Sequence, residues 1–307
     1  MHSEPLSRRT FLAASAGLAA YATRAAGARR QPEMIKRTIP DEEEQLPVIG
    51  LGTWQTFDVG PTEAERAPLR EVLKRFHALG GRVIDTSPMY ARAEAVVGEL
   101  TTELGINESL FLATKVWTQG ESAGIHQIEA SLYNLKRQRL DLVQVHNLLD
   151  VDTHFDTLEE WQERGLIRYR GITHYTASAY AEVEENLDED DIEFVQINYS
   201  LLERQAELRI LPEAADEEIG VIINRPFAGG AALDKVKDKP LPDWAAEFDC
   251  RTWPQFLLKF IIAHPAVTCV IPATSDLVHL EDNMAAGKGK LPDPAMRERM
   301  SRYFDAL

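Results

Sequence analysis

The feature that most constrains the fold is a set of three short apolar segments, each of which ends in a polar side chain. The segments end in Asp85, Lys115 and His146, at intervals of 30 and 31 residues. This spacing fits a strand followed by a helical crossover to the next parallel strand. In a closed parallel barrel the carboxyl ends of the strands carry the catalytic loops. Since an unpaired lysine is costly to bury, we expect these three side chains to lie together for a chemical reason.

The same alternation of strands and helices continues along the rest of the chain. Apolar periodicity predicts a hairpin-like entry over residues 34–49, helices over residues 63–78, 125–135, 157–164, 253–263 and 276–286, and strands over residues 169–174, 194–198, 221–224 and 268–271. With 307 residues and 44% hydrophobic content, the chain can bury one large core. We therefore predict an α/β fold, a (β/α)8 TIM barrel formed by residues 34–304 as a single domain.

Composition argues against several classes of function. A net charge of −16 does not suit nucleic-acid binding, which needs a basic surface. Cys250 and Cys269 are the two cysteines, and they form no CxxC motif. The eight histidines form no HExxH motif, so the sequence predicts no metal site.

The first 28 residues have the order of an export signal. Arg8 and Arg9 precede a short apolar run over residues 11–22, and small-residue cleavage patterns follow at residues 20–22 and 26–28. The run is too short for a stable membrane span. We predict a twin-arginine signal peptide over residues 1–28, recognised by the twin-arginine translocation machinery, and a periplasmic protein. The alternative, a basic amphipathic start to a cytosolic protein, fits this order less well.

The loop after Asp85 adds a phenol to the three strand-end side chains. Pro88 stops the strand, and Tyr90 follows before a helical pattern that begins near Glu94. With Tyr90 included, the sequence resembles the aldo-keto reductase family, whose Asp-Tyr-Lys-His tetrad matches Asp85, Tyr90, Lys115 and His146. Further matching segments are residues 50–54, 94–98, 114–117, 196–202 and 271–275.

The resemblance implies an NAD(P)H-dependent oxidoreductase that reduces aldehydes or ketones to alcohols. Tyr90 would supply the proton, and Lys115 beside it would lower the phenol pKa from its usual value of about 10. Asp85 would pair with Lys115 and hold it in place. His146 would form a hydrogen bond with the substrate oxygen.

The resemblance also implies the residues that bind the nucleotide and the substrate. The expected cofactor contacts are Gly52, Thr53, Trp54, Thr173, His174, Gln196, Asn224, Arg225, Pro226, Ala273, Thr274, Ser275, His279 and Asn283. The expected substrate pocket consists of Trp54, Met89, Trp117 and Asn147.

The sequence departs from the family pattern in two ways. Asn224 stands where the family usually has an aromatic ring under the nicotinamide, and Ala273 and His279 stand where a cationic pair often binds the adenosine 2′-phosphate. Phosphate capture relies on charge-assisted hydrogen bonds. We therefore expect NADP as the cofactor with weak discrimination against NAD, which is also possible.

Residues 227–251 interrupt the alternation of strands and helices before the last strand. We expect them to form either a lid over the site or an exposed, mobile insertion.

The sequence leaves two other functions open. The competing function is a nucleotide-binding sensor or accessory subunit with little turnover. A barrel isomerase or lyase is more remote, because the sequence has no metal cluster or phosphate motif.

Overall fold

The computed structural model describes residues 32–189 and 191–307. The predicted signal peptide, residues 1–28, lies outside the described residues. From Glu33 to Leu307 the chain forms one compact unit. In the described part of the chain, no helix has the length and apolar character needed to cross a membrane.

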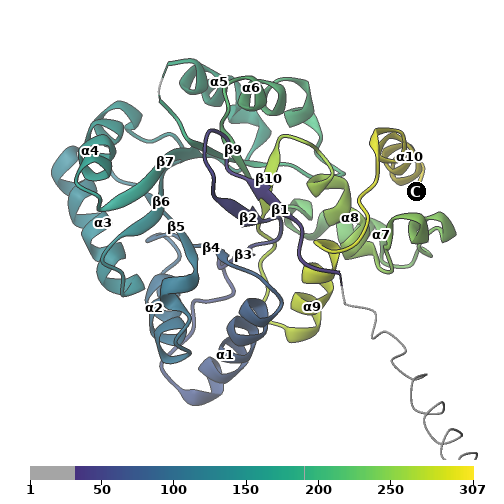
Figure 1. Cartoon of the computed structure of the whole chain (residues 1–307), viewed down its shortest axis with the longest axis horizontal. Helices are drawn as coiled ribbons and strands as arrows, with labels where there is room; N and C mark the ends of the chain where they lie inside the picture. Colours follow the sequence, from purple (N-terminus) through teal and green to yellow (C-terminus); the bar gives the residue numbers. More distant parts are fainter. Residues whose placement is uncertain (1–31, 190) are drawn as a thin grey trace, which may run out of the picture. The chain divides into compact units, whose positions relative to one another are not determined.

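Eight parallel strands form the centre of this unit (Figure 1). In order around the sheet they are β3 (Leu51–Gly52), β4 (Val83–Asp85), β5 (Phe111–Val116), β6 (Leu140–His146), β7 (Ile167–Thr173), β8 (Phe194–Asn198), β9 (Gly220–Asn224) and β10 (Val267–Val270). Backbone hydrogen bonds from Gly50 N to Val270 O, 2.8 Å, and from Val270 N to Val48 O, 3.0 Å, join the last strand to the first. The predicted (β/α)8 barrel is confirmed.

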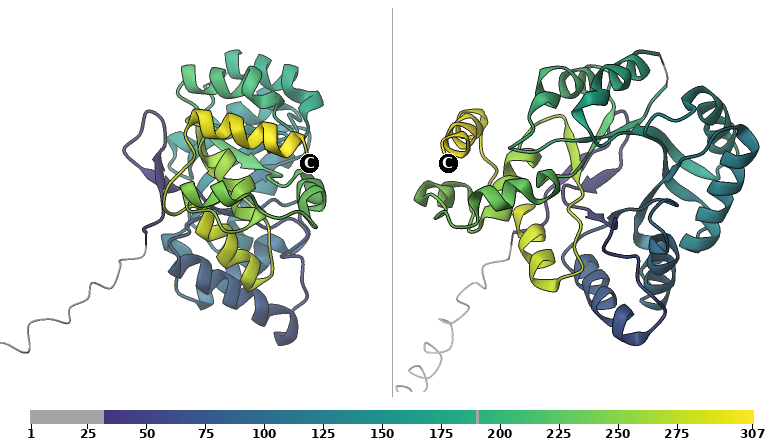
Figure 2. Two further views of the ribbon diagram at one scale, coloured as in Figure 1. Left: turned by 90° about the vertical axis from the view of Figure 1, so that its right-hand side faces the viewer. Right: turned by 180° about the vertical axis from the view of Figure 1, so that it is seen from behind.

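Helices surround this barrel (Figure 2). They are α1 (Glu63–Ala78), α2 (Ala93–Glu103), α3 (Glu121–Leu135), α4 (Val151–Glu163), α5 (Tyr180–Glu189), α6 (Ile210–Asp216), α7 (Ala231–Val236), α8 (Trp253–Ile262), α9 (Leu277–Ala286) and α10 (Pro294–Asp305). The largest boundary error in the sequence predictions concerns α4, which begins at Val151 rather than at residue 157. Val151, Phe155 and Leu158 are all buried at helical spacing, so the helix faces the core from its first turn.

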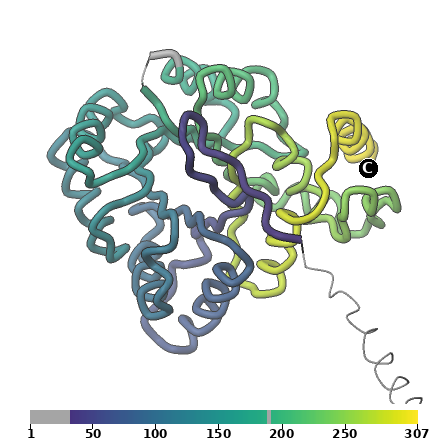
Figure 3. Tube along the Cα trace, viewed as in Figure 1, coloured from purple at the N-terminus to yellow at the C-terminus, as the bar shows by residue number. Residues whose placement is uncertain are grey.

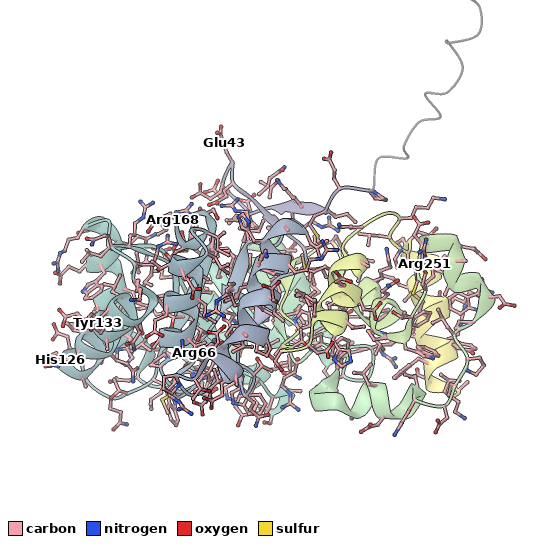
Figure 4. The ribbon with its side chains drawn as sticks, turned by 90° about the horizontal axis from the view of Figure 1, so that it is seen from below. Glu43, Arg66, His126, Tyr133, Arg168 and Arg251 are labelled. Atoms are coloured by element: carbon pink, nitrogen blue, oxygen red, sulfur yellow. The ribbon has the colours of Figure 1, made fainter. Side chains whose placement is uncertain are left out.

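An antiparallel hairpin covers the amino-terminal end of the barrel (Figure 3). Its strands are β1 (Lys36–Thr38) and β2 (Gln45–Pro47), which confirms the predicted entry hairpin. Ile39 and Leu46 are buried and pack into the interior of the barrel with side chains of the parallel strands. Glu44 forms an ion pair with Arg168, which Figure 4 places at the same end of the barrel as Glu43. Apolar side chains and an ion pair therefore hold the hairpin in place.

Most of the predicted lid is packed against the barrel instead of covering the site. In residues 227–251, the side chains of Val236 and Phe248 are buried, and Trp244 contacts Phe256 and Tyr303 at centroid distances of 5.7 and 5.6 Å. These apolar contacts join the segment to α8 and α10, which Figure 1 shows beside α7. The lid prediction is therefore wrong beyond residue 230. Only the first residues of the segment reach the cavity described below.

Helices α2 and α3 are in close contact at Gly98. A Cβ atom at Gly98 would lie 2.1 Å from the backbone oxygen of Asn134 and 2.8 Å from Leu135. Both neighbours are backbone atoms, so neither can move without shifting a helix. The backbone of Gly98 is helical, so its dihedral angles do not require a glycine. The close packing of the two helices is what requires it.

We predict that Gly98→Ala lowers the free energy of unfolding by about 1–3 kcal/mol, the range typical of overpacking. The reason is that α2 must move away from α3 to admit the methyl group. Urea unfolding at neutral pH measures the effect. Thr102→Ala, at an exposed position of the same helix, is the control and should leave stability unchanged or slightly raised. Equal stability of Gly98→Ala and the wild type would contradict the prediction.

Candidate active site

A buried ion pair lies at the carboxyl ends of β4 and β5. Lys115 Nζ donates to Asp85 Oδ1 at 2.7 Å and to the backbone oxygen of Thr86 at 2.7 Å. The two charged side chains are only 1% and 4% exposed. Burial lowers the pKa of Lys115, but its interactions with Asp85 and Tyr90 together more than offset this, so the pKa lies above its ordinary value. Lys115 is therefore an ammonium ion at neutral pH.

A set of amides holds the second carboxylate oxygen of Asp85. Gln196 Nε2 donates to Asp85 Oδ2 at 2.7 Å, and Gln144 Nε2 donates to it at 3.4 Å. Gln196 Oε1 in turn accepts from Thr173 Oγ1 at 3.2 Å and from Asn224 Nδ2 at 3.4 Å. Gln196 thus links the carboxylate to the residues at the ends of β7 and β9, in addition to any contact with a ligand.

The Tyr90 phenol lies beside this pair. Lys115 Nζ is 5.1 Å from the centroid of the Tyr90 ring. Burial raises the pKa of Tyr90 above its ordinary value, and the positive charge of Lys115 only partly opposes the rise. The expectation of a lowered pKa is therefore wrong, because it left out the cost of burying a phenolate. Near neutrality Tyr90 is a protonated phenol, which is the form that donates a proton.

His146 lies against Tyr90 from the end of β6. The two ring centroids are 6.2 Å apart with the rings nearly perpendicular, and the centroid of Trp117 lies 6.1 Å from that of His146. Burial, with smaller contributions from Lys115 and His174, lowers the pKa of His146 to about 3. Ser87 Oγ lies 3.5 Å from His146 Nδ1. If Ser87 donates there, the neutral ring carries its proton on Nε2 and can donate it to a ligand.

These groups border a cavity of about 690 Å³ at the carboxyl ends of the strands. The sequence-predicted residues that line it are Gly52, Thr53, Trp54, Asp85, Met89, Tyr90, Trp117, His146, Asn147, Thr173, His174, Gln196, Asn224, Arg225, Pro226 and Ala273. Lys115 lies behind the wall of the cavity, where it contacts Asp85. The structure thus brings together three members of the predicted tetrad on the wall and the fourth directly behind it.

The remaining predicted cofactor contacts follow Ala273 and do not line the cavity. Thr274 and Asn283 are buried, whereas Ser275 and His279 are exposed. Asp276 caps α9 by accepting hydrogen bonds from Val278 N and His279 N at 2.8 and 2.9 Å. Contact of these four residues with a nucleotide stays a prediction.

Several lining residues were not among the individually predicted contacts. Gln55, Thr56 and Tyr175 were not predicted at all, Phe227, Gly229 and Gly230 were predicted only as part of the lid segment, and Ile271 and Pro272 only as part of the matching segment 271–275. Tyr175 is the most informative, because its ring stacks on His174 with a centroid distance of 5.4 Å and an angle of 2°. An aromatic residue two positions after the end of β7 is the sequence signal that could have indicated it.

Unpaired polar atoms on the wall suit a polar ligand such as a nucleotide. Among the described residues, the buried atoms Thr56 Oγ1, Asn147 Oδ1, Asn224 Oδ1 and Arg225 Nε have no hydrogen-bond partner. Such atoms are costly to leave unpaired. Within residues 32–189 and 191–307, no group of histidine, cysteine and acidic side chains is arranged to hold a metal ion.

Comparisons with known proteins agree with this geometry. Residues 48–300 match the Aldo/keto reductase family. Methylglyoxal reductase YeaE of Escherichia coli is 30% identical over 249 residues, which cover 78% of this chain and 85% of that protein. The NADP-dependent D-sorbitol-6-phosphate dehydrogenase of Malus domestica is 25% identical over 290 residues, 82% of this chain and 89% of that protein.

A solved structure gives the same result. An aldo/keto reductase from Klebsiella pneumoniae, in complex with NADP and acetate, superposes with a TM-score of 0.73 at 26% sequence identity, covering 88% of this chain and 96% of that one. The fold, the four tetrad residues and the extent of the family match lead to one conclusion. The chain belongs to the aldo/keto reductase family.

Proposed function

We propose that this protein reduces an aldehyde or ketone to the alcohol with NADPH. The observation that carries the proposal is the position of the Tyr90 phenol beside the buried Lys115–Asp85 pair, on the wall of the cavity. The relatives named above support the same class of reaction, since one is a methylglyoxal reductase and another is NADP-dependent.

The residues of the site would handle the proton of this reaction. When bound, NADPH supplies the hydride that the carbonyl carbon receives. Tyr90 donates its phenolic proton to the carbonyl oxygen as negative charge develops there. The Lys115 ammonium ion, 5.1 Å from the ring centroid, then stabilises the phenolate that remains. Asp85 keeps Lys115 charged and fixed in position.

His146 would orient the carbonyl group. Because its pKa is about 3, the imidazole is neutral at pH 7 and does not compete with Tyr90 as an acid. A neutral imidazole with its proton on Nε2 can donate one hydrogen bond to the substrate oxygen. Two donors aimed at one oxygen, the phenol and the imidazole, stabilise the charge that develops in the transition state.

The polar wall between β7 and β9 would hold the nicotinamide end of the cofactor. Asn224 donates to the backbone oxygen of His174 at 3.0 Å, and its own Oδ1 is unpaired. The side chains of Thr173 and Gln196 lie in the same hydrogen-bonded group. A carboxamide, which both donates and accepts hydrogen bonds, complements such a wall.

Export by the twin-arginine route remains part of the proposal. The support comes from the order of residues 1–28, a paired arginine followed by an apolar run and small-residue cleavage patterns. This route carries folded proteins, so the barrel would fold around its nucleotide before export and reach the periplasm loaded.

We predict that Tyr90→Phe lowers kcat for carbonyl reduction by about 100- to 10,000-fold, the range of a lost general acid. The dissociation constant for NADPH should change only a few-fold, because the phenol acts in proton transfer. Steady-state oxidation of NADPH with a panel of aldehydes and ketones measures kcat, and fluorescence titration measures nucleotide binding. Tyr133→Phe, at a position that is 84% exposed on the outer surface, is the control (Figure 4).

Near-native turnover of Tyr90→Phe would contradict the assignment of Tyr90. A wild-type protein that binds NADPH but reduces no carbonyl of the panel would favour the nucleotide-binding accessory function instead.

We predict that His146→Gln makes stability less sensitive to acid. The native pKa of about 3 lies below the ordinary histidine pKa of 6.5, so between these pH values the unfolded chain binds a proton that the native protein does not. Stability therefore falls as the pH falls through this window. The variant should lose less, by up to about 1.4 kcal/mol per pH unit. Urea unfolding at several pH values within and above the window measures this slope. Identical slopes for the two proteins would show that His146 is not held neutral.

We predict that replacing both Arg8 and Arg9 with lysine leaves active protein in the cytoplasm. Arg24→Lys, which changes an arginine outside the pair, is the matched control and should be exported normally. Cell fractionation followed by NADPH-dependent carbonyl reduction in each compartment measures the result. Export of the double variant at the wild-type level, or periplasmic protein without bound nucleotide, would contradict the proposal.

A further inference from the structure

Arg225 differs from the other partly buried arginines of residues 32–189 and 191–307. Each of the others has a carboxylate or backbone carbonyl oxygen within 4.0 Å: Arg37, Arg66, Arg70, Arg82, Arg137, Arg168, Arg170, Arg204 and Arg297. Within the described residues the guanidinium of Arg225 has no such partner, and its Nε is buried without a hydrogen bond. A partly buried cation without a counterion is costly, so a partner from outside the chain is expected.

The loop after β9 holds the Arg225 guanidinium in place. Arg225 has a left-handed backbone with φ of 47°, and its carbonyl accepts a hydrogen bond from Ala228 N at 2.8 Å. A Cβ atom at Gly229 would lie 3.2 Å from Arg225 Nη2, so the glycine leaves room for the side chain. The guanidinium carbon lies 6.0 Å from the centroid of Tyr175, whose ring stacks on His174. Both Arg225 and Tyr175 line the cavity.

The other ionisable groups that line the cavity carry no uncompensated charge. Asp85 is paired with Lys115. Burial lowers the pKa of His146 and of His174, so both rings are neutral at pH 7. In the part of the chain that the structure describes, Arg225 is thus the one lining residue with an unbalanced charge. In a protein of net charge −16, this gives the cavity a local preference for an anion.

We propose that Arg225 is an anion-recognition residue that binds a carboxylate or phosphate group of the ligand in this cavity. The planar guanidinium forms two parallel hydrogen bonds with either group. Two sources provide that chemistry: an acidic group on the carbonyl substrate, or the phosphates of the nucleotide. The assignment of these sources rests on the proposed function, whereas the recognition of an anion does not.

The experiment compares the wild type with Arg225→Met, which keeps the length of the side chain and removes its charge. Arg225→Lys keeps the charge without the planar fork. Arg139→Met removes one exposed arginine elsewhere and controls for net charge. One arm measures the dissociation constants of NADPH and NADH by fluorescence titration. The other measures kcat/KM for 4-carboxybenzaldehyde and for its uncharged methyl ester, a pair that differs by one carboxylate.

A substrate anion predicts that Arg225→Met loses tenfold or more in kcat/KM for the acid, with the ester and nucleotide binding changed less than threefold. A nucleotide anion predicts a tenfold or larger rise in both dissociation constants and equal losses for the acid and the ester. Arg225→Lys should fall between the wild type and Arg225→Met in the affected arm, and Arg139→Met should match the wild type.

Folded Arg225→Met protein that matches the wild type in both arms would overturn the proposal. A wrong proposed function gives a different pattern from a wrong anion proposal. If only the proposed function is wrong, the wild type reduces neither aldehyde, while nucleotide binding still depends on Arg225.

Discussion

The ion pair of Lys115 with Asp85 is the interaction on which the site depends. Taking two charges out of water costs several kcal/mol for each ion, and further hydrogen bonds to both ions help to offset this cost. Lys115 donates to Thr86 O as well as to the carboxylate. The second carboxylate oxygen accepts from Gln144 and Gln196. Side chains from β4, β5, β6 and β8 therefore meet at one carboxylate. The positions of these strands in the barrel fix the positions of Asp85, Lys115 and the two glutamines.

The fold was predictable because its signal is periodic. Spacing near 30 residues between Asp85, Lys115 and His146 required parallel strands with helical crossovers, and the structure confirms this arrangement. The boundary of α4 was less predictable, since Asp150, in a left-handed conformation, precedes a buried first turn. Local propensity gives no clear signal for such a start.

The electrostatic state of the site was not predictable from residue types. The neighbourhood of Lys115 suggested a lowered pKa for Tyr90, but burial raises it, and the extent of burial depends on residues distant in sequence. The sequence also does not show that the guanidinium of Arg225 is unpaired. That becomes clear only when its contacts are compared with those of the other partly buried arginines. A resemblance to a family indicates which residues meet, whereas the three-dimensional packing decides their charge.

The hairpin of β1 and β2 has a consequence for the order of events at the site. Ile39 and Leu46 fill the amino-terminal end of the barrel, so the cavity at the other end is a well with a solid base. Two reactants that share such a well exchange through the same mouth. A ligand deep in such a well can leave only after a ligand nearer the mouth has left. The hairpin, together with the side chains of the strands, thereby closes the barrel at the end away from the site.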